Sequence, residues 1–408
     1  MSPKRVSETF AALHSPNYRL WFYGQMFSLV GTWMQSTAQG YLVFDLTHSA
    51  AFLGYVSIAN GLPSILFTLF GGVIADRIPR RKMIVITQTS MMVLAAVLAF
   101  LTFSNFVRPW HIILLAFLLG ISNAFDTPAR QSFVAELVER KDMTNAIALN
   151  STMFNIGTVV GPAIAGLVYA WLGPGWCFTI NAISFIAVII ALLLMKLAAF
   201  TPQVTSGGSA VKDMLEGLRF AMADKTIRCL LINLGIIGLF GFALLNLMPA
   251  WAVDVLKGDV KTNSWLLSAR GVGSLIGALM IAYIGSGGTR GKVWTLGYLL
   301  TPIFFYIFAF IRWVPASLFM LVLIGWSVMA MINTTNALIQ SHVPDNLRGR
   351  VMGVYALIFM GGTPIGAFIS GELADVIGSP NTVILFTTVV LIAGWVTFFK
   401  RPQMRSLN

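Results

Sequence analysis

Asp126 and Arg130 are the charged side chains that could do proton chemistry in this sequence. Both lie in a long apolar run, and their spacing of four places them on one face of a helix. The pKa of a carboxylate in apolar surroundings is readily moved, so Asp126 is a candidate for binding and releasing a proton. The alternative is a permanent ion pair with Arg130, which would keep Asp126 ionised and unable to carry a proton.

We find no pattern for a metal, a haem or a nucleotide phosphate. None of the four histidines lies near the centre of an apolar run. The segment "GGTRGKV" lacks two residues of a phosphate-binding loop, because Ser286 replaces the first glycine and Val293 replaces the hydroxyl residue. We therefore expect no cofactor, no metal, no ATP hydrolysis and no enzymatic activity.

The elements that hold these residues are expected to be transmembrane helices. Of the 408 residues, 57% are hydrophobic and only 10% are charged, and apolar runs of membrane-spanning length recur throughout. Such runs must satisfy their backbone groups internally, which favours helices. The expected spans are 18–45, 50–75, 82–105, 110–137, 143–172, 175–197, 226–256, 263–286, 292–312, 315–342, 349–377 and 380–400. The first of them lacks a signal-peptide cleavage site, so we expect it to be retained.

The distribution of Lys and Arg predicts the orientation of the chain. Four of these residues lie on the side opposite the amino terminus and Arg270 lies inside a span, which leaves 22 of the 27 on the amino-terminal side. Both termini are therefore expected in the cytoplasm, in a multi-pass protein of the plasma (inner) membrane. The net charge of +12 suits anionic lipid and requires no nucleic acid. Cys177 and Cys229 fall near opposite faces of the membrane, so we expect no disulfide between them. We expect the protein to be a monomer.

Glycines repeat at a constant interval and predict two related halves. Five glycines recur 205 residues later, as the pairs Gly120/Gly325, Gly157/Gly362, Gly161/Gly366, Gly166/Gly371 and Gly173/Gly378. This indicates parallel repeats of six helices each. We expect a first half at 1–198, a linker at 199–225 and a second half at 226–408.

The linker contains a flexible stretch and one amphipathic segment. "TPQVTSGGS" is the flexible stretch, and the residues that share one helical face after it are Val211, Met214, Leu215, Leu218 and Met222. This pattern favours a helix lying in the membrane interface. A solvated linker helix is the alternative.

Two polar stripes run along otherwise apolar spans. In the first span the stripe consists of Gln25, Ser28, Thr32, Gln35 and Gln39, which extends roughly 20 Å. In the tenth span it consists of Asn333, Asn336 and Gln340. Such stripes either line a polar, uncharged cavity or hydrogen-bond neighbouring helices together.

The segment "GGVIADRIPRRK" resembles the loop between helices 2 and 3 of the major facilitator superfamily. The matching residues are Gly72, Asp76, Arg77, Arg80 and Arg81, with Gly71 beside them, whereas Pro79 stands where the family usually has glycine. The resemblance implies that Asp76 meets the start of helix 11, near Gly349, and latches the cytoplasmic side. A plain positive-inside loop is the alternative, and it leaves Asp76 and the glycine pair unexplained.

Three further segments narrow this resemblance. "NYRLWFYGQMFSLVGTWMQSTAQGYLVFDLTHSA", "NAFDTPARQSFVAELV" and "GTVVGPAIAG" are similar to the drug:proton antiporter branch that includes macrolide-efflux and enterobactin-export proteins. Within the last segment, the motif associated with export consists of Gly157, Gly161, Pro162 and Gly166. Its alternative explanation is close packing of small residues.

The resemblance implies an all-α integral membrane protein with twelve transmembrane helices in two pseudo-symmetric halves. Its expected function is secondary active export of amphipathic small organic molecules by alternating access, with proton antiport. The expected partners are a small-molecule substrate, protons and membrane lipid. A siderophore or metabolite exporter is the alternative within transport, and a lipid flippase or a non-transporting receptor is the alternative outside it.

The remaining charges within the spans are few. Arg270 lies in the eighth span, where it either pairs with an unidentified acid or extends toward the membrane surface. The acids near the outer helix ends are Asp45, Asp254, Glu372 and Asp375. We expect these four to be solvated helix termini.

Overall fold

The computed structural model describes residues 10–197, 210–284 and 289–407, and every regular element in these ranges is helical. The long helices of the first part of the chain are α2 (Pro16–Thr47), α3 (Ala50–Arg77), α4 (Arg80–Phe103), α5 (Pro109–Leu137), α6 (Met143–Leu172) and α7 (Pro174–Leu194). Those of the second part are α9 (Lys225–Phe240), α11 (Val260–Ile284), α12 (Arg290–Phe310), α13 (Val314–His342), α14 (Asp345–Ile377) and α15 (Ser379–Lys400). The fold is thus all-α, as predicted.

Eleven helical segments of the described residues are long and apolar enough to cross a membrane. The first long helix, α2, is not among them, although it has 32 residues. Its polar stripe explains the difference, because each Gln, Ser or Thr lowers the mean hydropathy without shortening the helix. With α2 included, the described helices agree with the twelve that the sequence predicts.

The span predicted at 226–256 is not one continuous helix. It consists of α9, a 3₁₀ segment at Phe242–Leu247, the short α10 (Met248–Ala250) and a π turn at Trp251–Val255. Gly241 ends α9, and glycine is among the weakest helix formers. Pro249 lacks the N–H that a continuous helix would need. The predicted span is confirmed as one apolar segment, Lys225–Val255, long enough to cross a membrane, whereas its helix is interrupted after α9.

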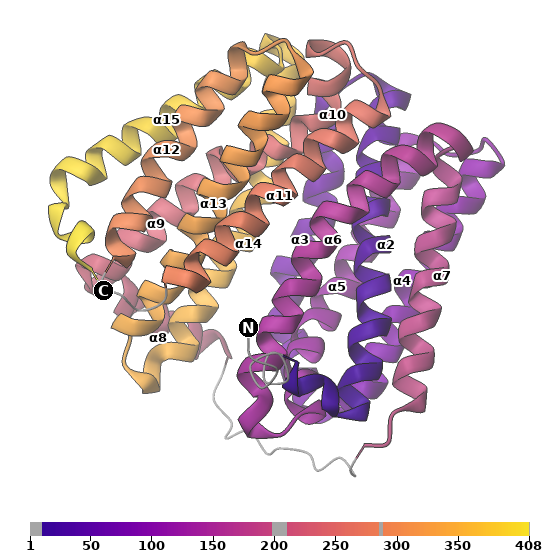
Figure 1. Cartoon of the computed structure of the whole chain (residues 1–408), viewed down its shortest axis with the longest axis horizontal. Coiled ribbons are helices and arrows are strands. Elements are labelled where there is room, and N and C mark those ends of the chain that lie inside the picture. Colours follow the sequence, from indigo (N-terminus) through magenta and orange to yellow (C-terminus); the bar gives the residue numbers. More distant parts are fainter. Residues whose placement is uncertain (1–9, 198–209, 285–288, 408) are drawn as a thin grey trace, which may run out of the picture. The chain divides into compact units, whose positions relative to one another are not determined.

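The chain forms two compact units. The first contains Met1–Leu42 and Leu62–Ser206, and the second contains Val43–Gly61 and Gly207–Asn408. The hairpin Val43–Gly61, made from the end of α2 and the beginning of α3, therefore packs with the second unit. The division predicted at 198 and 226 remains a prediction, and Figure 1 shows the helices of each unit running alongside one another.

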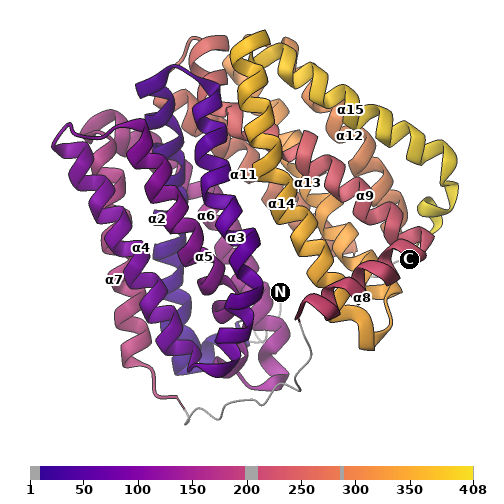
Figure 2. The same cartoon turned by 180° about the vertical axis from the view of Figure 1, so that it is seen from behind.

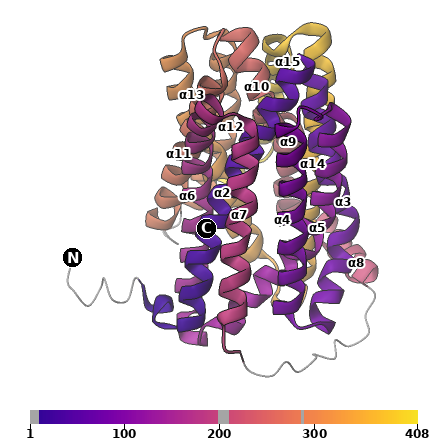
Figure 3. The ribbon, with the colours of Figure 1, turned by 90° about the vertical axis from the view of Figure 1, so that its right-hand side faces the viewer.

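Within the first unit, α4 and α7 lie side by side, as Figure 3 shows. Their neighbours share a core whose largest fully buried side chains include Tyr18, Trp21 and Phe133. The second unit has a separate core that includes Trp294 and Tyr298 of α12. Each unit thus contains its own buried cluster, which holds its helices at fixed positions.

The repeated glycines have equivalent backbone roles in the two units. Gly173 ends α6 with φ +92° and Gly378 ends α14 with φ +84°, a region that favours glycine. A Cβ added at Gly161 would lie 2.9 Å from the carbonyl oxygen of Val30 in α2. A Cβ added at Gly366 would overlap the carbonyl oxygen of Leu239 in α9. The sequence repeat is therefore also a repeat of helix packing.

The amphipathic segment forms the helix α8 (Ala210–Ala223), and "TPQVTSGGS" lies outside the described residues. Figure 2 shows α8 beside the beginning of α14, where Arg350 contacts Asp213 at 2.9 Å and Glu216 at 2.7 Å. Ala221 is fully buried. The exposed apolar side chains on α8 are Leu215, Leu218 and Met222. That α8 lies in the membrane interface remains a prediction.

Candidate functional site

Asp126 lies on α5 and is 1% exposed. Its Oδ1 accepts hydrogen bonds from the Thr87 hydroxyl at 2.8 Å and from the Gln88 amide nitrogen at 3.1 Å, both on α4. Its Oδ2 lies 3.4 Å from Nε of Arg130, one helical turn away. The predicted pair of Asp126 and Arg130 therefore exists within a larger polar cluster between α4 and α5.

Thr87 can serve either protonation state of Asp126. Its Oγ1 lies 2.8 Å from the carboxylate and 3.0 Å from the carbonyl oxygen of Ile84. A hydroxyl has one proton, so it donates to only one of these acceptors at a time. When Asp126 is ionised, Thr87 donates to it. When Asp126 is protonated, the Thr87 hydroxyl can donate to the Ile84 carbonyl oxygen and accept a hydrogen bond from the carboxylic acid.

Gln88 offers the same choice through its amide. Its side chain is buried, and within the described part of the chain its Oε1 has no hydrogen-bond partner. Rotating the amide by half a turn would exchange Nε2 for Oε1 at Asp126, and the two atoms are nearly indistinguishable in shape. Ionised Asp126 can thus accept a hydrogen bond from the Nε2 of Gln88, and protonated Asp126 can donate one to its Oε1.

Arg130 holds Asp126 less tightly than a buried ion pair would. The 3.4 Å separation exceeds the 2.7–2.9 Å that is usual for a charge-assisted hydrogen bond. The side chain of Arg130 is 29% exposed, so solvent shares its charge. The geometry thus leaves the proton-carrier interpretation of Asp126 open and adds Thr87 and Gln88 to it. The sequence did not point to these two residues, because polar residues near the beginning of a span are common.

The cations that follow α3 have contacts of their own in the first unit. Arg80 forms an ion pair with Glu136 at the end of α5. Arg81 donates to the carbonyl oxygens of Leu193 at 2.8 Å and Met195 at 3.3 Å, at the carboxyl end of α7. A cation there satisfies free carbonyl groups and interacts favourably with the helix dipole. These two arginines therefore stabilise helix ends.

Asp76 and Arg77 form part of the last turn of α3, and the Arg77 side chain is exposed. The side chain of Asp76 lies outside the described part of the structure. The contact that the resemblance implies for Asp76 therefore remains a prediction.

The two glycines before Asp76 differ in their surroundings. A Cβ added at Gly71 would overlap the carbonyl oxygen of Ala124 in α5. A Cβ added at Gly72 would meet no described atom within 4 Å. Gly71 therefore allows α3 to approach α5 closely, whereas Gly72 makes no such contact with the described residues.

These neighbouring glycines provide a matched test of stability. Gly71→Ala should destabilise the purified protein by about 1–3 kcal/mol, because the methyl group would overlap rigid backbone. Gly72→Ala should leave the thermal unfolding temperature close to that of the parent. Both temperatures can be measured in detergent by the change in tryptophan fluorescence. Equal stability of the two variants would contradict the close approach of α3 to α5.

The helix 5 motif packs α6 against α2. A Cβ added at Gly157 would lie 2.8 Å from the Trp33 ring, and one added at Gly161 would lie 2.5 Å from Trp33 Cβ. Pro162 and Gly166 are both buried. The motif therefore has the packing role of the alternative explanation, and a part in the direction of transport remains a proposal.

The polar stripe of α2 faces more than one environment. Gln25, Ser28, Gln35 and Gln39 are buried, whereas Thr32 is exposed. Gln35 accepts a hydrogen bond of 2.7 Å from Asn181 in α7. Gln35 therefore helps to hold α2 and α7 together, which is one of the two roles predicted for the stripe.

The stripe of α13 includes a local side-chain pair. The Gln340 amide donates to Asn336 at 2.6 Å, and Asn336 also hydrogen-bonds Tyr355 of α14. Asn333 is half-buried, and Gln340 is exposed. The structure thus brings Asn336 and Gln340 together and links them to α14.

Arg270 and the acids Glu372 and Asp375 make contacts that the sequence did not predict. The Arg270 guanidinium on α11 lies 6.0 Å from the ring centre of Phe242, beside the break after α9. Asp375 is exposed and Glu372 is half-buried, and both also accept hydrogen bonds from the hairpin Val43–Gly61. The expectation of solvated helix ends remains a prediction for these two acids, and the structure adds these contacts to it.

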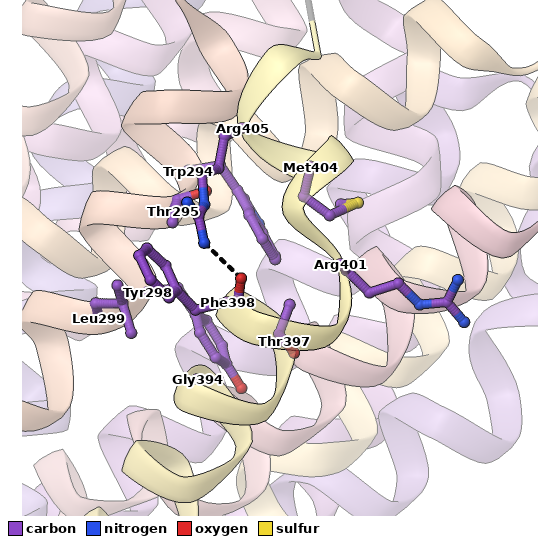
Figure 4. A pocket seen from close by; sticks show the side chains of 10 residues that line it. All are labelled: Trp294, Thr295, Tyr298, Leu299, Gly394, Thr397, Phe398, Arg401, Met404 and Arg405. Atoms are coloured by element: carbon purple, nitrogen blue, oxygen red, sulfur yellow. Dashed lines mark hydrogen bonds between the residues drawn. The ribbon is translucent and has the colours of Figure 1, made fainter.

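A small cavity at the carboxyl end of the second unit is not suited to a drug-sized molecule. Its volume is about 10 Å³, and Figure 4 shows its lining between α12 and α15. Arg405 donates to the carbonyl oxygen of Phe398 at 2.5 Å, and its guanidinium lies 3.5 Å from the Phe398 ring centre. Ligand pockets are usually about 300–1,000 Å³ in volume. This region therefore anchors the end of the chain.

Residues 7–408 match the family described as "Transmembrane secretion effector". Multidrug efflux pump Tap of Mycolicibacterium fortuitum is 29% identical over 381 residues, which cover 90% of this chain and 91% of that protein. The staphyloferrin A transporter of Staphylococcus aureus is 26% identical, with coverage of 94% and 96%. Macrolide efflux protein A of Streptococcus pyogenes is 25% identical, with coverage of 92% and 94%.

Solved structures with the same fold are more distant in sequence. A mutant of the nucleoside transporter NupG superposes with a TM-score of 0.78 at 13% identity, covering 96% of this chain and 100% of that one. A bacterial homologue of the human lysosomal transporter Spinster gives 0.76 at 13% identity, with coverage of 95% and 97%. These similarities establish the fold.

Proposed function

Because the chain belongs to the transmembrane secretion effector family of the major facilitator superfamily, we propose that it is a secondary exporter of amphipathic small organic molecules, driven by proton antiport. The observation that carries the coupling step is the buried Asp126, whose partners Thr87 and Gln88 can accommodate both protonation states. Export is supported by similarity to proteins named for efflux of multiple drugs and macrolides.

In this proposal Asp126 alternates between a carboxylate and a carboxylic acid. Proton binding removes the charge that attracts Arg130, so the ion pair weakens while Thr87 and Gln88 reverse their hydrogen bonds. Arg130 is partly exposed and can be solvated when it loses its partner. The polar cluster between α4 and α5 would thereby differ in charge between two states of the transport cycle.

The substrate class is proposed from the polar but uncharged stripes. The α2 stripe carries amide and hydroxyl groups and no charge, which is the chemistry that suits an amphipathic molecule forming a few hydrogen bonds. A siderophore or metabolite is the second candidate, because the staphyloferrin A transporter is a relative of similar identity. We propose that the protein lies in the plasma membrane with both termini in the cytoplasm. We also propose that it acts as a monomer.

Reconstitution in liposomes tests the proposal. Purified protein would be assayed for movement of a fluorescent amphipathic dye and of a macrolide, with and without an imposed pH gradient. We expect dye movement that depends on the pH gradient and that a protonophore abolishes. Because the proposed exchange is antiport, protons should cross the liposome membrane in the direction opposite to the dye. Movement of labelled phospholipid without dye transport would identify a flippase. Dye binding without any gradient-driven flux would identify a receptor and would refute transport.

A further inference from the structure

The end of α14 holds the beginning of α3. The Asp375 carboxylate accepts the backbone N–H of Ala50 at 2.6 Å, the N–H of Ala51 at 3.3 Å and the Ser49 hydroxyl. The first N–H groups of a helix have no partner within the helix, and a negative charge is stabilised there. Asp375 therefore caps α3 from a helix more than 300 residues further along the chain.

A second contact strengthens this attachment. The Tyr55 hydroxyl donates to Glu372 at 2.5 Å. Glu372 lies three residues before Asp375, so both carboxylates project from the same face of α14. We call the group Ser49, Ala50, Tyr55, Glu372 and Asp375 the clasp. Its hydrogen bonds to ionised groups are stronger than those between neutral groups.

Between α3 and α14, glycines allow the backbones to approach closely, and the rings of Tyr55 and Phe368 pack beside them. A Cβ added at Gly54 would lie 2.8 Å from the Ala367 carbonyl oxygen, and one added at Gly371 would lie 2.6 Å from that of Ala50. A Cβ added at Gly61 would overlap the ring of Pro364. The glycine contacts have no directional preference, so the hydrogen bonds of the clasp are the directional part of this attachment.

The chain passes between the two compact units at both ends of this hairpin. The unit boundary falls between Leu42 and Val43 within α2 and between Gly61 and Leu62 within α3. Pro63 follows the second boundary inside α3. Proline removes one hydrogen bond of the helix and commonly marks a bend. The hairpin Val43–Gly61 is therefore a segment that could change its partner.

Asp375 also lines a cavity together with other charged side chains. A cavity of about 380 Å³ in the second unit is lined by Asp375 together with Asp254, Lys257 and Arg312. Water in such a cavity and the two cations could stabilise the Asp375 charge after it leaves α3. Opening the clasp would not strand a buried charge.

We propose that the clasp is a latch that closes one side of the transport pathway and opens once in each cycle. The inference rests on the proposed transport function. In the proposed orientation the clasp lies on the outer side of the membrane. Asp375 and Glu372 are thus positioning residues, which act by holding the hairpin Val43–Gly61 rather than by touching substrate.

Reversible cross-linking tests the latch. The rings of Tyr55 and Phe368 are 5.8 Å apart across the α3–α14 contact. Tyr55→Cys with Phe368→Cys would be made in a chain whose native Cys177 and Cys229 are replaced, and then linked by a short, reducible thiol reagent in liposomes. Because Tyr55→Cys removes one contact of the clasp, the flux of the unlinked double-cysteine protein is measured first as the reference. We expect linkage to stop this gradient-driven dye flux and reduction to return it to the reference value.

A matched control pair lies within the first unit. The rings of Phe103 and Trp176 are 5.7 Å apart, between α4 and α7, and both side chains are exposed. Linking Phe103→Cys with Trp176→Cys should leave flux unchanged, because these helices stay packed together. The linked fraction in each protein would be measured by mass spectrometry of proteolytic fragments.

The outcomes separate the latch from the transport function. Full flux in the completely linked Tyr55→Cys, Phe368→Cys protein would overturn the latch while leaving transport intact. Absence of flux in the parent chain, before any linkage, would count against transport itself and would remove the basis of the latch. A further readout is Asp375→Asn, which should weaken the clasp and lower the linkage yield of the cysteine pair, whereas an unchanged yield would contradict its role.

Discussion

Replacing Asp126 with Asn is expected to abolish gradient-driven export while substrate binding survives. The amide cannot exchange a proton, but it has the size of the protonated acid and can still hydrogen-bond Thr87 and Gln88. Flux would be measured in liposomes with an imposed pH gradient. Binding would be measured as the rise in thermal stability that a transported dye produces. Glu139→Gln is the control, because Glu139 is an exposed acid just after the same helix and its pair with Lys141 should contribute little to stability.

Stability distinguishes a proton carrier from a structural ion pair at this position. If Asp126 only neutralises Arg130, Asp126→Asn should cost about 1–3 kcal/mol, because Arg130, which is partly exposed, loses a charged hydrogen-bond partner. The double change Asp126→Asn with Arg130→Gln should then restore both stability and flux. Proton-driven transport by that double variant would refute the coupling role of Asp126.

Asp76→Asn is expected to reduce transport strongly without unfolding the protein. The sequence motif predicts that Asp76 makes a contact in only one state of the cycle, so its loss should change rates rather than stability. Neighbouring Arg80 and Arg81 already bind Glu136 and the end of α7, and these contacts should persist. Initial rates of dye flux and the thermal unfolding temperature would be measured on the same preparation.

Glu139→Gln is the matched control for Asp76. Glu139 lies in the connection between α5 and α6, where a hydrogen bond from Lys141 lowers the pKa of its carboxyl group. Both side chains are largely exposed, and such pairs contribute little to stability. Normal flux in Asp76→Asn at normal protein levels would contradict the latch role, and an equal loss in Glu139→Gln would show that general surface charge is responsible.

The positions of the helices were predictable because the membrane imposes a simple rule on each segment. A run such as 110–137 must be apolar over the bilayer thickness, and the helix α5 at Pro109–Leu137 agrees closely. The break after α9 was missed because hydropathy does not register it. The residues Gly241 to Leu247 are nearly as apolar as a continuous membrane helix would be, so only the backbone reveals the 3₁₀ segment.

The candidate site was predictable only in its local part. Asp126 and Arg130 are four residues apart, and helix geometry alone places them together. Thr87 and Gln88 come from another helix, and which face of α4 meets α5 depends on packing rather than on spacing. The same reason explains why Gln35 was assigned to a stripe and was found bonded to Asn181.

By itself the sequence determined the helical class, the 205-residue repeat and the loop motif around Asp76, because each of these depends on residues that are close in the chain or on a regular interval. Only the tertiary structure decided which distant groups pair with one another. Asp375 shows this most clearly, since it is exposed at the end of α14 and yet accepts hydrogen bonds from the N–H groups of Ala50 and Ala51, which are far away in the chain. A charge takes the partners that the packing of helices brings to it, and that packing is settled by the shapes of whole surfaces rather than by any short stretch of chain.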